Sequence, residues 1–259
     1  MEFDEFKRRM LMSFRLDLNS YKETQLKRRM DGLLARQKIK DYAELFHLLT
    51  SDRMAYQTFL DNLTINVSEF FRDPHRWLEL EKKILPELLK LRGSIRIWSA
   101  ACSIGAEPYS LGILLDELGP NRQHRLDATD IDKTILDTAQ IGKYNQDAVR
   151  SVSNERLLKY FTASGSFYLI KDNIKKVVTY RRHDLLTDNY AQGYDLIVCR
   201  NVTIYFTREA QDKINKGFSQ SLHPGGFLFI GGSEMIFNYQ ELGLEKISPC
   251  FYRKRNNLN

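Results

Sequence analysis

Apolar residues recur at helical spacing through roughly the first sixty positions. The clearest stretches are Tyr21–Ile39 and Tyr42–Leu49, in which the apolar positions are Leu26, Met30, Leu33, Leu34, Leu45, Leu48 and Leu49. Steps of three and four residues bring such positions to one face of a helix. Asp41, Ser51 and Asp52 lie between the stretches and suit helix caps. The pattern predicts a small bundle of about four helices that ends near Leu63.

The pattern changes after a further amphipathic helix predicted at Pro74–Leu91, which Pro86 is expected to bend. Short apolar runs then alternate with helical stretches. The runs predict strands at Ser94–Ala100, Arg125–Thr129, Val177–Tyr180, Asp195–Cys199 and Phe227–Ile230, and the helices predicted between them are Glu107–Leu118, Lys133–Ile141 and Arg208–Leu222. Such alternation is typical of a parallel sheet covered by helices on both faces.

Residues 152–183 interrupt this alternation. A helix is predicted at Asn154–Tyr160, and the runs Ser166–Ile170 and Lys176–Arg182 follow it. We interpret the two runs as a small β-hairpin that leads back into the sheet, either as an inserted subdomain or as a long crossover. Later in the chain, Leu244–Ser248 and Cys250–Arg253 predict a closing hairpin.

Composition narrows the class of protein. The 259 residues are 42% hydrophobic and 28% charged, which is ordinary for a folded globular chain. No apolar run reaches the roughly 18 residues of a membrane span, and the first residues do not form a secretory signal. Three cysteines and five histidines show no metal-ligand spacing, so we expect neither a metal site nor a disulfide framework. These features predict a soluble, cytoplasmic protein without membrane insertion.

Candidate chemistry begins where the first predicted strand ends. Residues Ile97–Ser110 pass through a run of small side chains and Gly105, then open a helix with Pro108 in its first turn. Small residues at the carboxyl end of a strand let a ligand approach the backbone. The spacings Gly-x-Gly-x-x-Gly and Gly-x-x-x-x-Gly-Lys are absent, which disfavours dinucleotide and nucleoside triphosphate sites. A tight turn without a ligand is the alternative.

Polar residues also end the second and fourth predicted strands. Asp130 is placed to accept hydrogen bonds from two ribose hydroxyls, whereas Asp132 suits the N-cap of the next helix. A nucleoside without phosphates, such as S-adenosylmethionine, would suit Asp130 and the glycine-poor turn. Asn201 and Tyr205 follow the fourth strand; the alternatives are a turn residue for Asn201 and core packing for Tyr205 and Phe206.

Four segments of the sequence together resemble the CheR-type chemotaxis receptor methyltransferases. The segments are Asn66–Asp73, Trp98–Ser110, Thr129–Asp132 and Cys199–Phe206, and Leu222–Gly226 and Gly231–Glu234 extend the resemblance. In order and spacing they cover roughly residues 60 to 235. Two departures are Ser68, where many relatives have Thr, and Ala106, where a second Glu is frequent.

The resemblance implies a fold and an activity. The fold is a Rossmann-like class I methyltransferase domain, with a mostly parallel seven-stranded sheet and a small β-subdomain, preceded by an all-α domain. We expect residues 1–73 to form the receptor-docking domain and linker, and 74–259 the methyltransferase domain, with the β-subdomain within 152–183. The implied reaction moves a methyl group from S-adenosylmethionine to glutamate carboxylates of chemoreceptors, yielding S-adenosylhomocysteine. Its cofactor contacts would fall on Asn66, Ser68, Arg72, Ala101, Glu107, Asp130, Asp184, Leu185, Asn201 and Val202.

Catalysis of this kind requires no general base, because a glutamate with a pKa of about 4.3 is already ionised near neutral pH. We assign Arg72 to orient the incoming carboxylate or that of the cofactor, and Tyr205 to the edge where the methyl group is transferred. An Arg fork suits bidentate pairing with a carboxylate. The alternative for residues 68–72 is a helix capped by Ser68 with Arg72 in a surface ion pair.

The charge balance bears on the partner. The chain carries 39 basic and 33 acidic side chains, a net charge of +6. Between Lys27 and Lys40 a single acid accompanies six basic residues, which are Lys27, Arg28, Arg29, Arg36, Lys38 and Lys40. A solvated helix face is the alternative to a docking surface for the acidic helical bundle of a chemoreceptor. We expect a monomer and no nucleic acid partner; nucleic acid methylation and a non-catalytic docking module that senses the cofactor are the competing functions.

Overall fold

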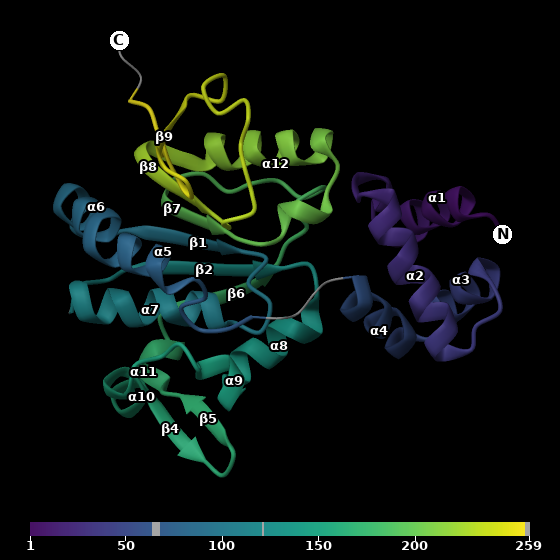
Figure 1. Ribbon diagram of the computed structural model, residues 1–259, viewed down its shortest axis with the longest axis horizontal. Coiled ribbons are helices and arrows are strands. Elements are labelled where there is room, and N and C mark those ends of the chain that lie inside the picture. Colours follow the sequence, from purple (N-terminus) through teal and green to yellow (C-terminus); the bar gives the residue numbers. More distant parts are fainter. Residues whose placement is uncertain (64–67, 121, 257–259) are drawn as a thin grey trace.

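The computed structural model describes residues 1–63, 68–120 and 122–256. Its helical N-terminal region, hereafter the helical domain, lies beside an α/β region (Figure 1). The helical domain contains a 3-10 turn at Leu18–Ser20 and four α-helices, as predicted: α1 (Phe3–Phe14), α2 (Glu23–Gln37), α3 (Tyr42–Ser51) and α4 (Arg53–Leu63). Asp41 caps α3, accepting from the backbone N–H groups of Ala43 and Glu44. Asp52 accepts from Met54 and Ala55 at the start of α4.

The predicted apolar stripe fills the core of the helical domain. Leu26, Met30 and Leu33 of α2 are almost wholly buried, and so are Leu45 and Leu49 of α3. They pack with aromatic side chains of α1 and α4 into one cluster. Helical periodicity therefore located α2 and α3 and most of their buried positions, because each face is apolar at steps of three and four residues. Leu34 and Leu48 of the predicted faces are half-buried.

The α/β region is built on a seven-stranded, mostly parallel sheet with the order β6-β2-β1-β7-β8-β10-β9. The strands are β1 (Arg96–Ala100), β2 (Arg125–Asp130), β6 (Val178–Arg182), β7 (Tyr194–Cys199), β8 (Leu222–Ile230), β9 (Leu244–Ser248) and β10 (Phe251–Lys254). The first five in the spatial order pair in parallel, whereas β10 is antiparallel to both β8 and β9. The predicted closing hairpin is confirmed.

Side chains alternate between two cores on opposite faces of this sheet. Ile97 of β1 packs in the core beneath α5 (Pro74–Glu79), α6 (Leu85–Arg92) and α7 (Ala106–Leu118). Its neighbours Trp98 and Ala100 lie in the other core, beneath α12 (Arg208–Ser221). Side chains of a strand point alternately to the two faces of the sheet. A strand that is buried on both faces is therefore apolar at nearly every position, and its sequence is a continuous apolar run.

The predicted helix at Pro74–Leu91 is interrupted just before Pro86. A π-helical turn at Leu80–Ile84 separates α5 from α6, and Pro86 lies in the first turn of α6. Proline has no N–H to continue the α-helical ladder, so the irregular turn precedes it.

The predicted hairpin between Ser166–Ile170 and Lys176–Arg182 is wrong. A separate three-stranded sheet contains β3 (Lys143–Asn145), β4 (Phe161–Ser164) and β5 (Phe167–Ile170), with β5 in the middle. The segment Val178–Arg182 is β6, which pairs in parallel with β2. The turn between β4 and β5 contains Gly165 at a φ of 60°, and β4 follows α10 (Asn154–Tyr160) directly, so no polar break marked its start.

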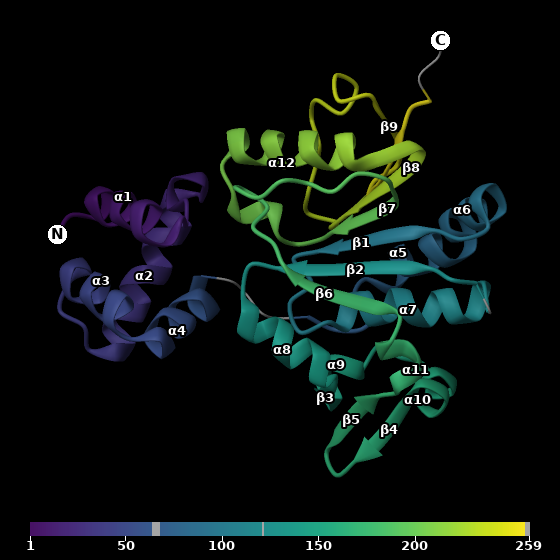
Figure 2. The ribbon, with the colours of Figure 1, turned by 180° about the vertical axis from the view of Figure 1, so that it is seen from behind.

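The small sheet projects from the α/β region beyond α9 (Gln146–Val149), α10 and α11 (Asp172–Lys175) (Figure 2). The remaining helix, α8 (Lys133–Ile141), follows β2 and packs on β2 and β6. The carboxyl ends of β1, β2, β6 and β7 face the helical domain, because the segments that follow them share a cavity with residues of that domain.

Candidate functional site

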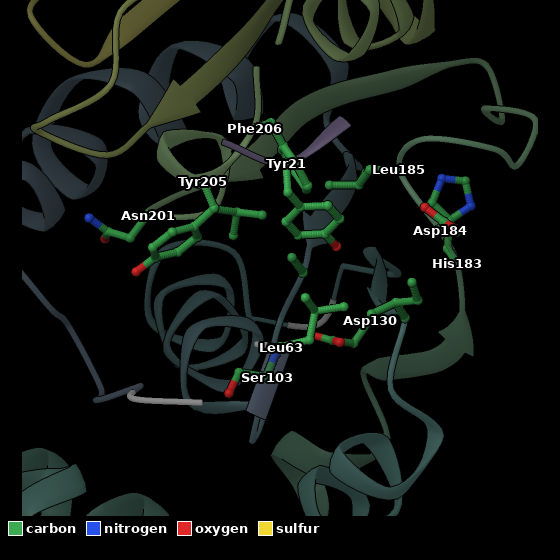
Figure 3. A pocket seen from close by; sticks show the side chains of 13 residues that line it. Tyr21, Leu63, Ser103, Asp130, His183, Asp184, Leu185, Asn201, Tyr205 and Phe206 are labelled. Atoms are coloured by element: carbon green, nitrogen blue, oxygen red, sulfur yellow. The ribbon is translucent and has the colours of Figure 1, made fainter. Parts of the chain in front are cut away.

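Two adjoining cavities lie at the carboxyl ends of the central strands. The first has a mostly apolar lining and is formed by Tyr21, Leu63, Ala101, Ser103, Asp130, Ile131, His183, Asp184, Leu185, Asn201, Val202, Tyr205 and Phe206. Figure 3 shows Tyr21 and Tyr205 on one side of this space and Asp130 and Ser103 on the other. The second cavity shares Ala101, Ser103, Asn201, Val202 and Tyr205 with the first. Together they form one elongated site.

Asp130 provides the buried carboxylate of the first cavity. The backbone N–H of Ser103 donates to its Oδ2 at 2.9 Å, and that of Asp132 donates to its Oδ1 at 3.1 Å. Burial raises the pKa of Asp130 to about 6. Asp132 caps α8 as predicted, accepting from Thr134 and Ile135. The two acids therefore divide their roles: one faces the cavity and the other begins a helix.

The turn after β1 holds an unusual backbone beside the cavity. Ala101 and Ser103 have φ angles of 57° and 50°, a left-handed conformation that costs energy in residues other than glycine. Gly105 has a φ of 84°, and a Cβ there would lie 2.6 Å from Tyr180 Oη. Only glycine fits this position. Conformational cost of this kind concentrates at binding sites, where it places backbone groups next to a ligand.

Glu234 organises the segment after β7. Its carboxylate accepts from the backbone N–H groups of Asn201 (3.0 Å), Val202 (3.0 Å) and Thr203 (2.8 Å) and from the N–H of Gly231 (2.6 Å). It also accepts from the Thr203 hydroxyl at 2.8 Å. Sequence reasoning quoted Gly231–Glu234 only as part of the family resemblance and gave Glu234 no role. Glu234 follows the carboxyl end of β8, and nothing in its sequence spacing indicates a contact with the segment after β7.

The second cavity is polar and carries both signs of charge. Arg72, Glu107 and Arg200 line it together with Ser68. Ser99 Oγ donates to Glu107 Oε1 at 2.8 Å, and Arg200 Nη1 lies 3.8 Å from Glu107 Oε2. Burial raises the pKa of Glu107, and the positive charge of Arg200 opposes that rise. This end of the site can therefore receive a ligand that carries an ammonium and a carboxylate.

The linker that carries Arg72 is anchored by its aromatic pair. The Phe70 N–H donates to the Ala148 carbonyl at 2.9 Å, and the Phe71 N–H donates to Ser110 Oγ at 3.1 Å. The Phe70 ring meets Tyr144 of β3 edge to face, with centroids 4.8 Å apart. The alternative in which Ser68 caps a helix is wrong, because α5 begins at Pro74.

Arg72 lies between the polar cavity and a more open groove. Besides Arg72, the groove is lined by Ser68, Glu69, Ile104, Asn145, Asp147, Ala148 and Arg150. Arg150 Nε and Glu69 Oε2 form an ion pair of 2.5 Å at this groove. Arg72 thus borders both the interior cavity and the groove that opens to the surface.

The helical domain closes the other end of the site. The Lys22 N–H donates to the Tyr205 carbonyl at 2.9 Å, and the Thr207 N–H donates to the Ser20 carbonyl at 2.8 Å. The Tyr21 ring meets Phe206 edge to face at 4.9 Å. Sequence reasoning missed Tyr21 and Leu63 and considered Phe206 only as core. No local signal could have found them, because the contacts join segments far apart in the chain.

The structure brings nearly all of the predicted site residues together. Those that line the two cavities are Ser68, Arg72, Ala101, Glu107, Asp130, Asp184, Leu185, Asn201, Val202 and Tyr205. Asn66 lies outside the described residues. Of the basic group, Lys27, Arg28, Arg36, Lys38 and Lys40 are exposed, whereas Arg29 is half-buried. Arg36 donates to Asn62 Oδ1 of α4, and Arg29 packs against Tyr205.

A mostly parallel seven-stranded sheet, with a buried acid at the end of its second strand and a site across its carboxyl edge, is the architecture of a class I S-adenosylmethionine-dependent methyltransferase. Residues 66–249 match the SAM binding domain of CheR methyltransferases, and residues 1–64 match their all-alpha domain. The chain belongs to the CheR methyltransferase family.

Curated relatives match almost the full chain. A chemotaxis protein methyltransferase of Listeria monocytogenes is 45% identical, and one of Listeria innocua 44% identical, each over 92% of both chains. Chemotaxis protein methyltransferase 1 of Pseudomonas aeruginosa is 37% identical over 85% of both chains. Within the residues described, every helix is too short or too polar to cross a membrane.

The residues present fit S-adenosylmethionine. The apolar cavity, with Leu185 and Phe206 in its wall, suits an adenine ring, and Asp130 can accept hydrogen bonds there. The mixed charges of Arg72, Arg200 and Glu107 suit the amino and carboxylate groups at the other end of that molecule. An apolar lining with a few placed polar groups is the usual design of a cofactor site.

Proposed function

We propose that this methyltransferase esterifies side-chain carboxylates of specific glutamates on chemoreceptors, as a cytoplasmic enzyme of sensory adaptation. The products are glutamate methyl esters and S-adenosylhomocysteine. The observation that carries the proposal is the position of Arg72, which borders both the polar cofactor cavity and the groove open to the surface. A carboxylate that enters by the groove meets a guanidinium before it reaches the cofactor. The curated relatives are named chemotaxis protein methyltransferases, which supports a substrate in chemotaxis.

Bound S-adenosylmethionine supplies an electrophilic methyl group on a sulfonium. The chain itself has to hold the acceptor oxygen in line with that methyl and keep water away. Alignment of this kind can account for about 7–11 kcal/mol of the barrier. Arg72 would orient the acceptor carboxylate, because its guanidinium fork matches two oxygens. The Tyr205 ring, which lines the same cavity, would border the transfer.

The cofactor contacts follow from the two cavities. Asp130 would accept from the ribose hydroxyls, and Asp184 and Leu185 would border the adenine, as would Asn201 and Val202 on the Glu234-held segment. Glu107 would receive the amino group at the polar end, where Ser68 and Ala101 also lie. Asn66 completes the proposed set.

We assign receptor docking to the helical domain within residues 1–73, whose linker also brings Ser68 and Arg72 to the site, and the methyltransferase domain to 74–259 with the small sheet. The exposed bases between Lys27 and Lys40, which are Lys27, Arg28, Arg36, Lys38 and Lys40, would complement the acidic helices of a receptor. Charges at the rim of an interface act mainly on the rate of association and on its salt dependence. The contribution of these residues is therefore expected in KM for the receptor.

Transfer of labelled methyl groups from S-adenosylmethionine to a purified receptor cytoplasmic fragment tests the proposal. We expect label that alkali releases as methanol, as an ester requires. Arg72→Ala should abolish the transfer, Arg72→Lys should restore only part of it because it lacks the fork, and the exposed Arg8→Ala should match the wild type. Alkali-stable label, or transfer to nucleic acid in place of the receptor, contradicts the proposal. Cofactor binding without any transfer would instead indicate a sensing module.

A further inference from the structure

We propose that Arg29 is a positioning residue for Tyr205, through which the helical domain completes the methyl-transfer site. This inference rests on the proposed function for its kinetic consequences. It separates Arg29 from the other basic residues of its segment, with which sequence reasoning had grouped it as a docking residue.

Arg29 lies against the face of the Tyr205 ring. Its guanidinium carbon is 4.4 Å from the ring centroid, well within the distance at which a cation is attracted to an aromatic face. Arg29 is half-buried, whereas its neighbours Lys27 and Arg28 are exposed. Burial makes such a contact stronger, because less water screens the charge.

The Arg29 guanidinium is also held at its edge. Nη1 donates to the carbonyl of Leu63, the last residue of α4. A planar guanidinium can stack by its face while it donates from its edge, which a lysine ammonium cannot do. Two contacts in different directions fix the group, and both partners, Leu63 and Tyr205, line the first cavity.

Tyr205 depends on the helical domain for both its backbone and its ring. Its carbonyl accepts from Lys22 N–H at 2.9 Å, and the turn that contains it is held on the other side by Glu234 through Thr203. These bonds fix the backbone but leave the side chain free to rotate about its χ angles. Arg29 covers the ring face and so restricts the remaining freedom.

The position of the ring matters because Tyr205 lines both cavities. A ring that rotated away would leave the junction of the adenosine and methionine ends open to water. Rotation of the ring would disturb the alignment of the methyl transfer more than the binding of the adenosine or methionine end of the cofactor, since the other lining residues remain in place. Loss of Arg29 should therefore appear in kcat, whereas loss of the exposed docking bases should appear in KM.

Steady-state kinetics with a receptor fragment test this distinction. Arg29→Ala should lower kcat about tenfold while KM for the receptor and Kd for S-adenosylmethionine stay near the wild-type values. Arg29→Lys, which keeps the charge but not the fork, should recover part of kcat. Arg8→Ala is the matched control, an exposed arginine of α1 that pairs with Glu5. Thermal unfolding of each variant confirms that it is folded.

A double-mutant cycle tests whether Arg29 acts through Tyr205. In a Tyr205→Ala background, Arg29→Ala should cause no further loss of kcat, because the partner ring is already gone. An additive loss would overturn the proposal. A raised KM with unchanged kcat for Arg29→Ala would also overturn it and return Arg29 to the docking surface.

Fluorotyrosine placed at position 205 gives a readout that needs no activity. In the wild-type background its fluorine resonance should differ from that of an exposed tyrosine, and Arg29→Ala should move it toward the exposed value while Arg8→Ala should not. A resonance that Arg29→Ala leaves unchanged rejects the contact. If the wild-type enzyme fails to methylate the receptor, the proposed function fails, and the fluorine signal still decides whether Arg29 holds the ring.

Discussion

The two walls of the cofactor site are held by different forces. On the α/β side, backbone N–H groups bind two carboxylates, those of Asp130 and Glu234. On the helical-domain side, the Tyr21 ring meets Phe206 and Arg29 lies over the Tyr205 ring. Two backbone hydrogen bonds, from Lys22 to Tyr205 and from Thr207 to Ser20, join the same segments. The first wall resists small displacements because each hydrogen bond has a direction. The second combines two backbone hydrogen bonds with less directional ring contacts, and its side chains come from a separate domain.

This contrast predicts the sizes of mutational effects. A buried carboxylate that satisfies several backbone donors leaves all of them unpaired when it is removed. Removal of a ring from the helical-domain wall removes only packing contacts, and neighbouring side chains can partly fill the space that it leaves. Changes in the α/β wall should therefore affect stability and binding together, and changes in the other wall should affect binding or turnover more selectively.

Glu234→Ala is expected to have the largest effect. It leaves the N–H groups of Asn201, Val202, Thr203 and Gly231 without their acceptor. The free energy of unfolding should fall by about 3–5 kcal/mol, measured by urea denaturation, and cofactor binding should be lost in calorimetry. Glu241→Ala, at an exposed position, is the control and should change stability by less than about 0.5 kcal/mol. A folded Glu234→Ala variant with wild-type affinity would refute the role of this acid.

Asp130→Asn should come next, with a loss of about 2–4 kcal/mol in S-adenosylmethionine affinity if the carboxylate accepts from two hydroxyls. Its pKa of about 6, raised by burial, adds a pH dependence. Above that pH the ionised acceptor is present, and below it protonation competes with the ligand, so affinity should fall as the pH drops through 6. Calorimetry across this range should show the fall in the wild type and none in Asp130→Asn. A pH dependence that survives in the variant would assign it to another group, such as Asp61, whose pKa is also raised to about 6.

Tyr21→Leu tests the helical-domain wall. It keeps an apolar side chain but removes the edge-to-face contact with Phe206, so cofactor affinity should fall by about 1 kcal/mol. Tyr21→Phe keeps the ring and should bind like the wild type. If Tyr21→Leu also binds normally, the helical domain does not contribute to the cofactor site.

Reversal of Lys27 and Arg28 to Glu should have the smallest effect on the enzyme itself. Both side chains are exposed, so stability and cofactor affinity should not change, while KM for the receptor should rise at low salt and approach the wild-type value at high salt. Arg36 is left out of this test because it donates to Asn62 and its loss would disturb α4. An unchanged KM for the receptor at low salt would show that Lys27 and Arg28 do not take part in docking.

The two walls also differ in how far they could be predicted. The α/β wall is formed by short segments at strand ends. Asp130 was predicted from its position at the end of a strand, whereas Glu107 and Asn201 were assigned as cofactor contacts by the family resemblance. Glu234 was missed because it acts on a neighbouring strand that lies distant in the sequence. Tyr21 and Leu63 were missed because the sequence around each of them gives no sign of which distant segment it contacts. The strand pairing of the small sheet was predicted wrongly because β4 follows α10 without a break, so its start left no signal in the sequence. Which short strands pair with one another also depends on tertiary contacts.

Mapping of the modified residue tests the central claim most directly. The wild-type enzyme, S-adenosylmethionine and a receptor cytoplasmic fragment are incubated, and the fragment is digested and sequenced by mass spectrometry. The account predicts methyl esters confined to glutamate side chains and absent when Arg72→Ala replaces the wild type. Methyl groups on nitrogen or on other residues, or no modification by an enzyme that binds the cofactor, would contradict it.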